Sequence, residues 1–226
     1  MAITQSFMKL LQICDAFFPV GAFTLSNGLE TYVQYDLVRK PTDLEAYLSA
    51  FLRFETYNDL ALAAHAWAHA DEREALLRLD ALSAASKLPK EIREGARRMC
   101  MRFTKVARQM GVNCLEPYTS WIKNGEAFGQ YAVAFGIYTR AQGVEQGDAV
   151  ALLGYNFVSA AVNNCVKLVP LGQQDGQRIL HQSLDAVFAA AETALTVEEN
   201  DIGLALPGFD VRAMQHEHLY TRQYMS

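Results

Sequence analysis

Residues 149–182, AVALLGYNFVSAAVNNCVKLVPLGQQDGQRILHQ, decide the fold class of this chain. No side chain from residue 149 to residue 166 carries a formal charge, and a membrane-spanning helix needs about 20 residues of this kind. Three amides interrupt the run and a cation closes it: Asn156, Asn163, Asn164 and Lys167. Because amides are costly to transfer from water into lipid, we expect a long helix buried within protein and no membrane span.

The same stretch predicts where the long helix ends. Pro170 lacks a backbone N–H and disfavours the helical conformation of the residue before it, so the helix is expected to end near Leu168 or Val169. Gly172 then permits a turn into a second helix. The residues beyond it carry uncharged amides: Gln173, Gln174 and Gln177. This corner is either a rigid turn with internally satisfied amides or a surface that docks a partner.

Length and composition favour one all-α domain. The chain has 226 residues, 51% of them hydrophobic, and contains no Gly/Ser-rich linker and no repeat of fixed period. We expect a compact multi-helix domain over residues 1–209 and a flexible C-terminal tail over residues 210–226, since that segment is polar yet carries Met214 and Tyr220. The N-terminus lacks the pattern of a secretory signal, which favours the cytoplasm.

The net charge of −5 disfavours nucleic acid as a partner of the whole protein, but one segment is strongly basic. Residues 87–108 contain eight Lys or Arg and two Asp or Glu, a local charge of +6. Helical spacing places apolar residues such as Ala96, Met99 and Phe103 on one face and the basic residues on the other. The basic face is either solvated surface or a docking face for an acidic protein.

The sequence contains no recognisable catalytic motif and no complete set of metal ligands. Its four cysteines form no C-x-x-C pair and are expected to be small core residues, and we expect no cofactor. His65 and His69 are spaced as two ligands on one helix face, and His216 and His218 flank Glu217 in the tail. The first pair has no third ligand nearby in the sequence, and the His-Glu-His trio, which could bind a divalent cation weakly, lacks a rigid shell of supporting residues. A nickel chaperone that uses these histidines is therefore the weakest interpretation, and no metal site is predicted.

Local signals predict helix starts and close packing. Thr42 is the expected cap of a helix that begins after Pro41, with Glu45 completing a capping box, and Asn58 is the expected cap of the next helix. Glycines recur from Gly125 to Gly143, which favours the close approach of neighbouring helix backbones. The N-terminal turn at residues 17–23 is too apolar for a solvated loop, so we expect it in a core or an interface.

Three stretches together resemble the urease accessory proteins of the F type, the UreF family. They are LLQICDAFFPVGAFTLSNGLETYVQ at residues 10–34, VKLVPLGQQDGQRIL at residues 166–180 and VRAMQHEHLYTRQYMS at residues 211–226. The patterns D-x-x-x-P-x-G…S-x-G-L-E and P-L-G-Q-x-x-G-Q are specific. Because the stretches occur in the expected order along a chain of the expected length, the resemblance covers essentially the whole sequence.

This resemblance implies a cytoplasmic, all-α homodimer without enzymatic activity. Such a protein binds the D/H-type urease accessory protein and recruits the GTPase UreG, so that nickel is delivered to apo-urease. The resemblance further implies that the tail becomes ordered when the D/H-type partner binds, with Arg222 anchoring the loop that holds Tyr32. The partner-binding candidates are Tyr32, Lys167, Gln173, Gln177, Met214, His216, Tyr220 and Arg222.

The sequence departs from the family pattern at two places. The family often has histidine where this chain has Gln130, which weakens any role of that segment in handling nickel. The family typically ends with Arg-Leu-Phe where this chain has Arg222-Gln223-Tyr224, which affects the affinity of the tail. The alternative is a regulator of GTP hydrolysis by the accessory GTPase, with an arginine of the basic helix supplied to the nucleotide.

Overall fold

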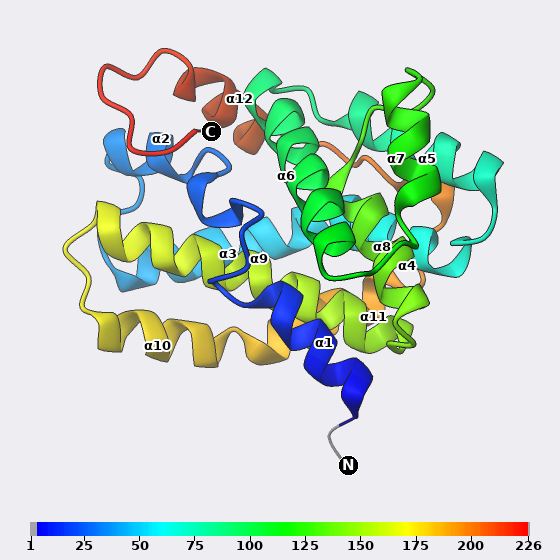
Figure 1. The fold of residues 1–226 in the computed structure, drawn as a ribbon. Coiled ribbons are helices and arrows are strands. Elements are labelled where there is room, and N and C mark those ends of the chain that lie inside the picture. The colour runs from blue at the N-terminus through cyan, green and yellow to red at the C-terminus, as the bar shows by residue number, and fades with distance from the viewer. Residues whose placement is uncertain (1–3, 226) are drawn as a thin grey trace.

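The long helix expected from the apolar segment lies at the centre of the protein (Figure 1). This helix, α9 (Gln146–Leu168), ends at Leu168 before Pro170, as predicted. The computed structural model describes residues 4–225, apart from the side chain of Phe23. Helices α1, α2, α3, α4, α8, α10 and α11 all pack against α9.

Every regular element among residues 4–225 is helical, which confirms the all-α prediction. The core is one continuous cluster of buried apolar side chains contributed by most of these helices. The elements are α1 (Gln5–Cys14), η1 (Ala22–Thr24), α2 (Leu29–Gln34), α3 (Pro41–Glu55), η2 (Thr56–Leu60), α4 (Ala61–Ala68), α5 (Arg73–Ser86), α6 (Lys90–Gln109), α7 (Glu116–Lys123), α8 (Tyr131–Ala141), α9, α10 (Gln173–Gln182), α11 (Leu184–Ala194), η3 (Glu199–Asp201) and α12 (Pro207–His216).

Helix α9 is a core helix of this fold. By length and composition alone it could cross a membrane, but 61% of its most apolar window is buried inside the protein. Leu153, Val158 and Cys165 are fully enclosed. Its buried amide Asn164 donates from Nδ2 to the carbonyl oxygen of Leu25 at 2.9 Å, which illustrates the pairing expected for a polar group inside the core.

The predicted cap of α3, Thr42, is wrong by two residues. The helix begins at Pro41, with Lys40 as its N-cap. Proline suits the first helical position because its fixed φ is close to the helical value and because an N–H at this position would have no partner within the helix. Asn58 does not cap a new helix either. It lies in the π-turn η2, where the chain bends from α3 into α4, and donates from Nδ2 to the carbonyl oxygens of Phe54 and Leu204.

Gly136 provides the close helix approach that the recurring glycines predicted. A Cβ atom at Gly136 in α8 would lie 2.6 Å from the carbonyl oxygen of Ala63 and 2.8 Å from the backbone nitrogen of Trp67, both in α4. The two backbones are therefore in direct contact. The prediction was wrong for the other glycines of this segment, which lie in turns outside α7 and α8: Gly125, Gly129 and Gly143.

Asp80 in α5 organises the loop that enters α8. It is fully buried, and its carboxylate accepts hydrogen bonds from the Tyr118 hydroxyl and from the backbone N–H groups of Phe128, Gly129 and Gln130. The side chain of Gln130 is buried as well and accepts from the Ser83 hydroxyl at 3.2 Å. Gln130, the departure from the family pattern, is thus part of an internal hydrogen-bond network.

Candidate partner-binding site

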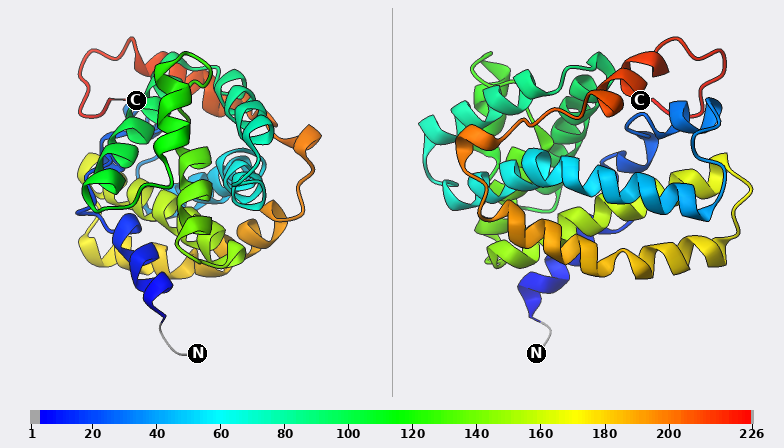
Figure 2. Two further views of the ribbon diagram at one scale, coloured as in Figure 1. Left: turned by 45° about the vertical axis from the view of Figure 1, so that its right-hand side comes forward. Right: turned by 180° about the vertical axis from the view of Figure 1, so that it is seen from behind.

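The predicted partner-binding residues come from four elements that meet at one end of the molecule. Figures 1 and 2 show α2, the turn between α9 and α10, and the chain after α12 side by side at this end. Helix α2 packs against both α9 and α12, and α10 packs against α9. Residues far apart in the sequence therefore share one surface region, from Tyr32 in α2 to Lys167 at the end of α9 and Gln173 at the start of α10.

The turn between α9 and α10 is held by its backbone and leaves its polar side chains exposed. Val169 N–H donates to the Cys165 carbonyl oxygen at 2.9 Å, and Gly176 N–H donates to the Gly172 carbonyl oxygen at 3.1 Å. The side chains at the corner are exposed: Lys167, Gln173, Gln174 and Gln177. Because the turn is formed by backbone hydrogen bonds, these side chains are accessible to another molecule.

The segment after Leu206 differs from the expected flexible tail. Residues 207–216 form α12, so the proposed boundary at residues 209 and 210 falls inside a helix. Phe209 anchors this helix, with its ring centroid 5.3 Å from that of Tyr47 and 5.8 Å from that of Phe54. Aromatic burial of this kind explains why the start of the segment is attached to the body.

The rest of the segment is attached through four ionisable side chains, which we call the tail clasp: Glu30, Glu91, His216 and Arg222. Glu30 accepts from the backbone N–H groups of Gln223 and Tyr224 at 2.7 and 3.1 Å, and its Oε2 lies 2.9 Å from His216 Nε2. Glu91 accepts from Arg222 Nη1 at 2.7 Å, and its Oε2 lies 2.6 Å from His216 Nδ1. Two carboxylates from α2 and α6 therefore hold the end of the chain.

The tail candidates differ in their accessibility. Tyr220 is fully exposed and Met214 is 40% exposed, whereas His216 is fully buried in the clasp. Arg222 contacts Glu91. Tyr32 is instead contacted by Arg212, whose guanidinium lies 5.9 Å from the centroid of the Tyr32 ring. In this conformation Tyr220 and Met214 are accessible to a partner, while His216 stabilises the fold.

Sequence reasoning missed Glu30 and Glu91, the two acceptors of the clasp. Glu30 is 2% exposed and lies in the first turn of α2, after Gly28 and Leu29. A carboxylate at such a position requires a partner, since burying an isolated charge is unfavourable. The S-x-G-L-E pattern contains this glutamate, but the sequence does not reveal that its partner, His216, lies 186 residues later.

The other histidine pair and the cysteines show no metal-binding arrangement. His65 Nε2 lies 2.8 Å from the Val197 carbonyl oxygen, and His69 pairs with Glu72. Within residues 4–225 no group of three His, Cys, Asp or Glu side chains is placed to hold a metal ion. Burial raises the pKa of Cys14 and of Cys165 to about 12, which keeps both thiols protonated near neutral pH.

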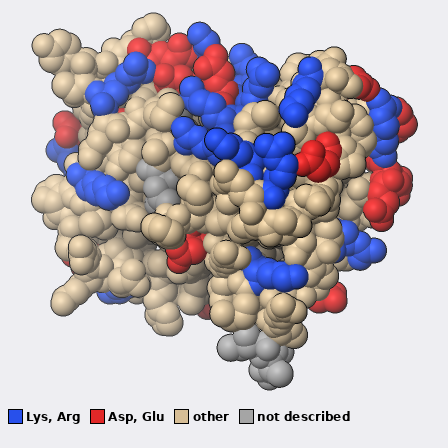
Figure 3. Space-filling view, viewed as in Figure 1, with Lys and Arg blue, Asp and Glu red and all other residues tan. Residues whose placement is uncertain are grey.

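The basic segment forms α6, with the two faces that its pattern predicted. Ala96, Met99 and Phe103 are buried against the body. The opposite face gathers blue side chains on the surface seen in Figure 3. Its exposed basic residues include Arg97, Arg102, Lys105 and Arg108. This face lies beside α12, so it adjoins the end of the molecule that carries the tail.

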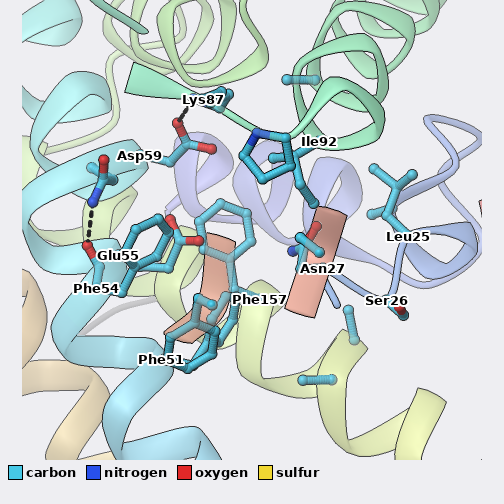
Figure 4. Close-up of a pocket in the computed structure, with 18 of the residues that line it drawn as sticks. Leu25, Ser26, Asn27, Phe51, Phe54, Glu55, Asp59, Lys87, Ile92 and Phe157 are labelled. Atoms are coloured by element: carbon cyan, nitrogen blue, oxygen red, sulfur yellow. Dashed lines mark hydrogen bonds and ion pairs between the residues drawn. The ribbon is translucent and has the colours of Figure 1, made fainter. Parts of the chain in front are cut away.

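A cavity of about 90 Å³ lies beneath α12, between α3, α6 and α9. Figure 4 shows its polar wall, where Lys87 Nζ pairs with Asp59 Oδ1 at 2.6 Å beside the carboxyl group of Glu55. One oxygen of Glu55 has no hydrogen-bond partner among the described residues. Burial raises the pKa of Glu55 to about 8, and the nearby carboxylate of Asp59 adds to this effect.

We expect Glu55 to make the stability of the protein fall as the pH rises. Between about pH 4.5 and about pH 8 the folded protein keeps a proton on Glu55 that the unfolded chain loses. The free energy of unfolding therefore decreases across this window, by at most about 1.4 kcal/mol per pH unit from this group. In Glu55→Gln this contribution disappears, which urea denaturation at a series of pH values measures. Glu192→Gln, at an exposed position, should keep the wild-type slope; an unchanged slope in Glu55→Gln contradicts the prediction.

Comparison with known proteins points to one family. The family model described as UreF matches residues 38–184. The urease accessory protein UreF of Haemophilus influenzae (strain PittEE) is 36% identical over 221 residues, covering 96% of this chain and 94% of that protein. UreF of Actinobacillus pleuropneumoniae serotype 5b (strain L20) is 37% identical over 222 residues, covering 96% of this chain and 97% of its own. UreF of Bacillus sp. (strain TB-90) is 33% identical over 223 residues, covering 97% of this chain and 98% of that protein.

The exposed side chains of the turn between α9 and α10 and of the tail lie at one end of this helical fold, where another molecule can reach them. The family match and the similarity over nearly the full length of the relatives make the assignment specific. The chain belongs to the UreF family of urease accessory proteins.

Proposed function

We propose that this chain is a non-enzymatic scaffold for urease maturation in the cytoplasm. It binds the D/H-type urease accessory protein and recruits the GTPase UreG, so that nickel reaches apo-urease, and it needs no cofactor of its own. The observation that carries the proposal is that α2, the turn between α9 and α10, and the tail lie at one end of the molecule, with candidate residues exposed on the turn and on the tail. A single docking surface of this kind suits a protein that holds partners together.

The tail offers the D/H-type partner an accessible aromatic anchor. Tyr220 is fully exposed at the tip of the loop after α12, and Met214 is exposed on that helix. Exposed aromatic and Met side chains of this kind are typical of the centre of protein interfaces once they are covered. The clasp places them beside α2, so the partner contacts the tail and the body together.

Tyr220→Ala is expected to weaken binding of the D/H-type partner by about tenfold or more without changing the stability of the isolated chain. An exposed side chain contributes little to folding, whereas an aromatic anchor contributes about 1.4 kcal/mol or more to binding. Calorimetric titration of the partner measures the first effect and thermal unfolding the second. Phe128→Ala is the matched control, because Phe128 is also exposed but follows α7, outside the proposed surface. Equal affinities for Tyr220→Ala and wild type contradict this assignment.

Urease activation tests the scaffold function itself. Apo-urease is expected to become active in the presence of nickel, the accessory partners and this chain, and activation should decrease when Tyr220→Ala replaces wild type. Removal of residues 218–226 is expected to decrease it further while leaving α12 and His216 intact. Undiminished activation by the truncated chain counts against the scaffold proposal.

The N-terminal turn provides a second surface that an assembly would cover. Phe18 and Val20 are buried, but Phe17 is 93% exposed, and Met8 and Leu11 of α1 are exposed nearby in the sequence. Isolated apolar side chains are common on protein surfaces, whereas such a group suits an interface. We include a homodimer in the proposal, and light scattering on the isolated chain tests it.

The alternative function, regulation of GTP hydrolysis by the accessory GTPase, rests on the basic face of α6. Its exposed arginines adjoin the tail end of the molecule, where UreG would be recruited (Figure 3). A regulator of GTP hydrolysis would supply one of them to the nucleotide and accelerate hydrolysis. Arg97→Ala is the cleaner variant, since Arg102 Nη1 occupies the space beside Gly21. If the chain does not accelerate hydrolysis by the GTPase, the scaffold function alone remains.

A further inference from the structure

His216, the last residue of α12, contacts a carboxylate with each of its two ring nitrogens. Nδ1 lies 2.6 Å from Oε2 of Glu91 in α6, and Nε2 lies 2.9 Å from Oε2 of Glu30 in α2. A neutral imidazole carries one N–H and donates once, whereas an imidazolium donates from both nitrogens. Two ionised carboxylates in these positions therefore each receive a hydrogen bond from the ring only when His216 carries both protons.

The net charge of the tail clasp depends on the second proton of His216. The side chain of His216 is 0% exposed and that of Glu30 is 3% exposed, so neither is screened by water. Glu91 also accepts from Arg222 Nη1 at 2.7 Å, and Tyr224 contributes its backbone N–H to Glu30. With an imidazolium the four charges of the clasp cancel. With a neutral ring one buried negative charge is left without compensation, which is unfavourable.

Arg212, the cationic residue one turn earlier in α12, does not replace this proton. Arg212 directs its guanidinium towards Tyr32 and Tyr35, at 5.9 and 5.2 Å from their ring centroids, and donates to Gln215. It therefore faces away from the clasp. The elements packed against His216 present Glu30 from α2 and Glu91 from α6, so the imidazole is placed between acids on both sides.

We propose that the tail clasp is a proton-dependent latch that controls attachment of residues 217–225. The segment stays on the body while His216 is an imidazolium and detaches as the ring loses a proton. Detachment breaks the hydrogen bonds of Gln223 and Tyr224 to Glu30 and of Met225 N–H to the Thr24 carbonyl oxygen. The latch follows from contacts within this chain, so it holds whether or not the tail binds a urease accessory partner.

Amide hydrogen exchange of the full chain tests the latch. The amides of Gln223 and Tyr224 donate to Glu30, so their protection reports attachment directly. After correction for the intrinsic rate, we expect their protection to fall as the pH is raised and His216 loses its second proton, by at most about tenfold per pH unit for the loss of one proton. Amides within α8 serve as the internal reference for global opening. A protection factor of the tail amides that does not change with pH overturns the proposal.

Three variants separate a latch from a merely structural contact. In Glu91→Gln the new amide donates to an unprotonated Nδ1 and still accepts from Arg222, so the tail is expected to stay protected with a much flatter pH profile. His216→Gln is expected to reduce protection already at about pH 6 and to show no further fall. His218→Gln, at an exposed position two residues away, should retain the wild-type profile. A Glu91→Gln profile that falls as steeply as that of wild type overturns the proton-dependent latch.

Discussion

Asp80→Ala is expected to lower the free energy of unfolding by about 4 kcal/mol, the largest effect of any single change considered for this protein. Asp80 is fully buried and accepts four hydrogen bonds, one from the Tyr118 hydroxyl and three from the backbone of residues 128–130. Removing the acceptor leaves the N–H groups of Phe128 and Gly129 without this partner, while Tyr118 and Gln130 keep only the hydrogen bonds between them. Each unpaired donor costs about 1–3 kcal/mol before the loop relaxes. Urea denaturation measures the change.

Asp80→Asn distinguishes the loss of hydrogen bonds from the loss of volume. Its remaining oxygen keeps an acceptor for part of the network, but its amide N–H₂ faces at least one backbone donor, so a loss of about 2 kcal/mol is expected. Asp71→Ala is the matched control at an exposed position and should change stability by less than about 0.5 kcal/mol. If Asp80→Ala is no more destabilising than Asp71→Ala, the loop before α8 is not organised by this carboxylate.

Gly136→Ala is expected to lower the free energy of unfolding by about 3 kcal/mol. The added Cβ would lie 2.6 Å from the Ala63 carbonyl oxygen and 2.8 Å from the Trp67 backbone nitrogen, and backbone atoms cannot rotate away as a flexible side chain can. The α4 and α8 helices must therefore separate, which disrupts a well-packed interface. Chemical denaturation of the variant measures this cost.

Gly147→Ala is the matched control for the helix-packing argument. Gly147 also lies in a helix, α9, but its nearest neighbour for an added Cβ is Leu195 Cδ1 at 3.8 Å, an ordinary contact distance. Alanine favours the helix over glycine, so this variant should be as stable as wild type or slightly more stable. A similar loss in both variants would contradict the close contact between α4 and α8.

The sequence predicted those features of the fold that depend on local chemistry. An uncharged run of residues ended by Pro170 was sufficient to place α9, and a 3.6-residue pattern was sufficient to assign the two faces of α6. Local signals failed where several of them competed. Thr42 has a suitable side chain for capping, but the proline before it takes the first helical position and moves the cap to Lys40.

The arrangement of the candidate site could be predicted only in part. The motifs identified exposed residues such as Tyr220 and Gln173, which require only a surface position. They did not reveal the tail clasp, because His216 and Glu30 are 186 residues apart and no local pattern encodes that pairing. The same limit applies to Asp80, whose partners lie 38 to 50 residues further along the chain.

Size-exclusion chromatography with light scattering tests the scaffold function most directly. This chain is co-expressed with the D/H-type accessory protein and the GTPase UreG, and wild type is compared with Tyr220→Ala and with the Phe128→Ala control. The scaffold function predicts a mixed complex that contains this chain and both partners, retained by Phe128→Ala and weakened by Tyr220→Ala. If the wild-type chain elutes alone in the presence of both partners, it is not the scaffold that we propose.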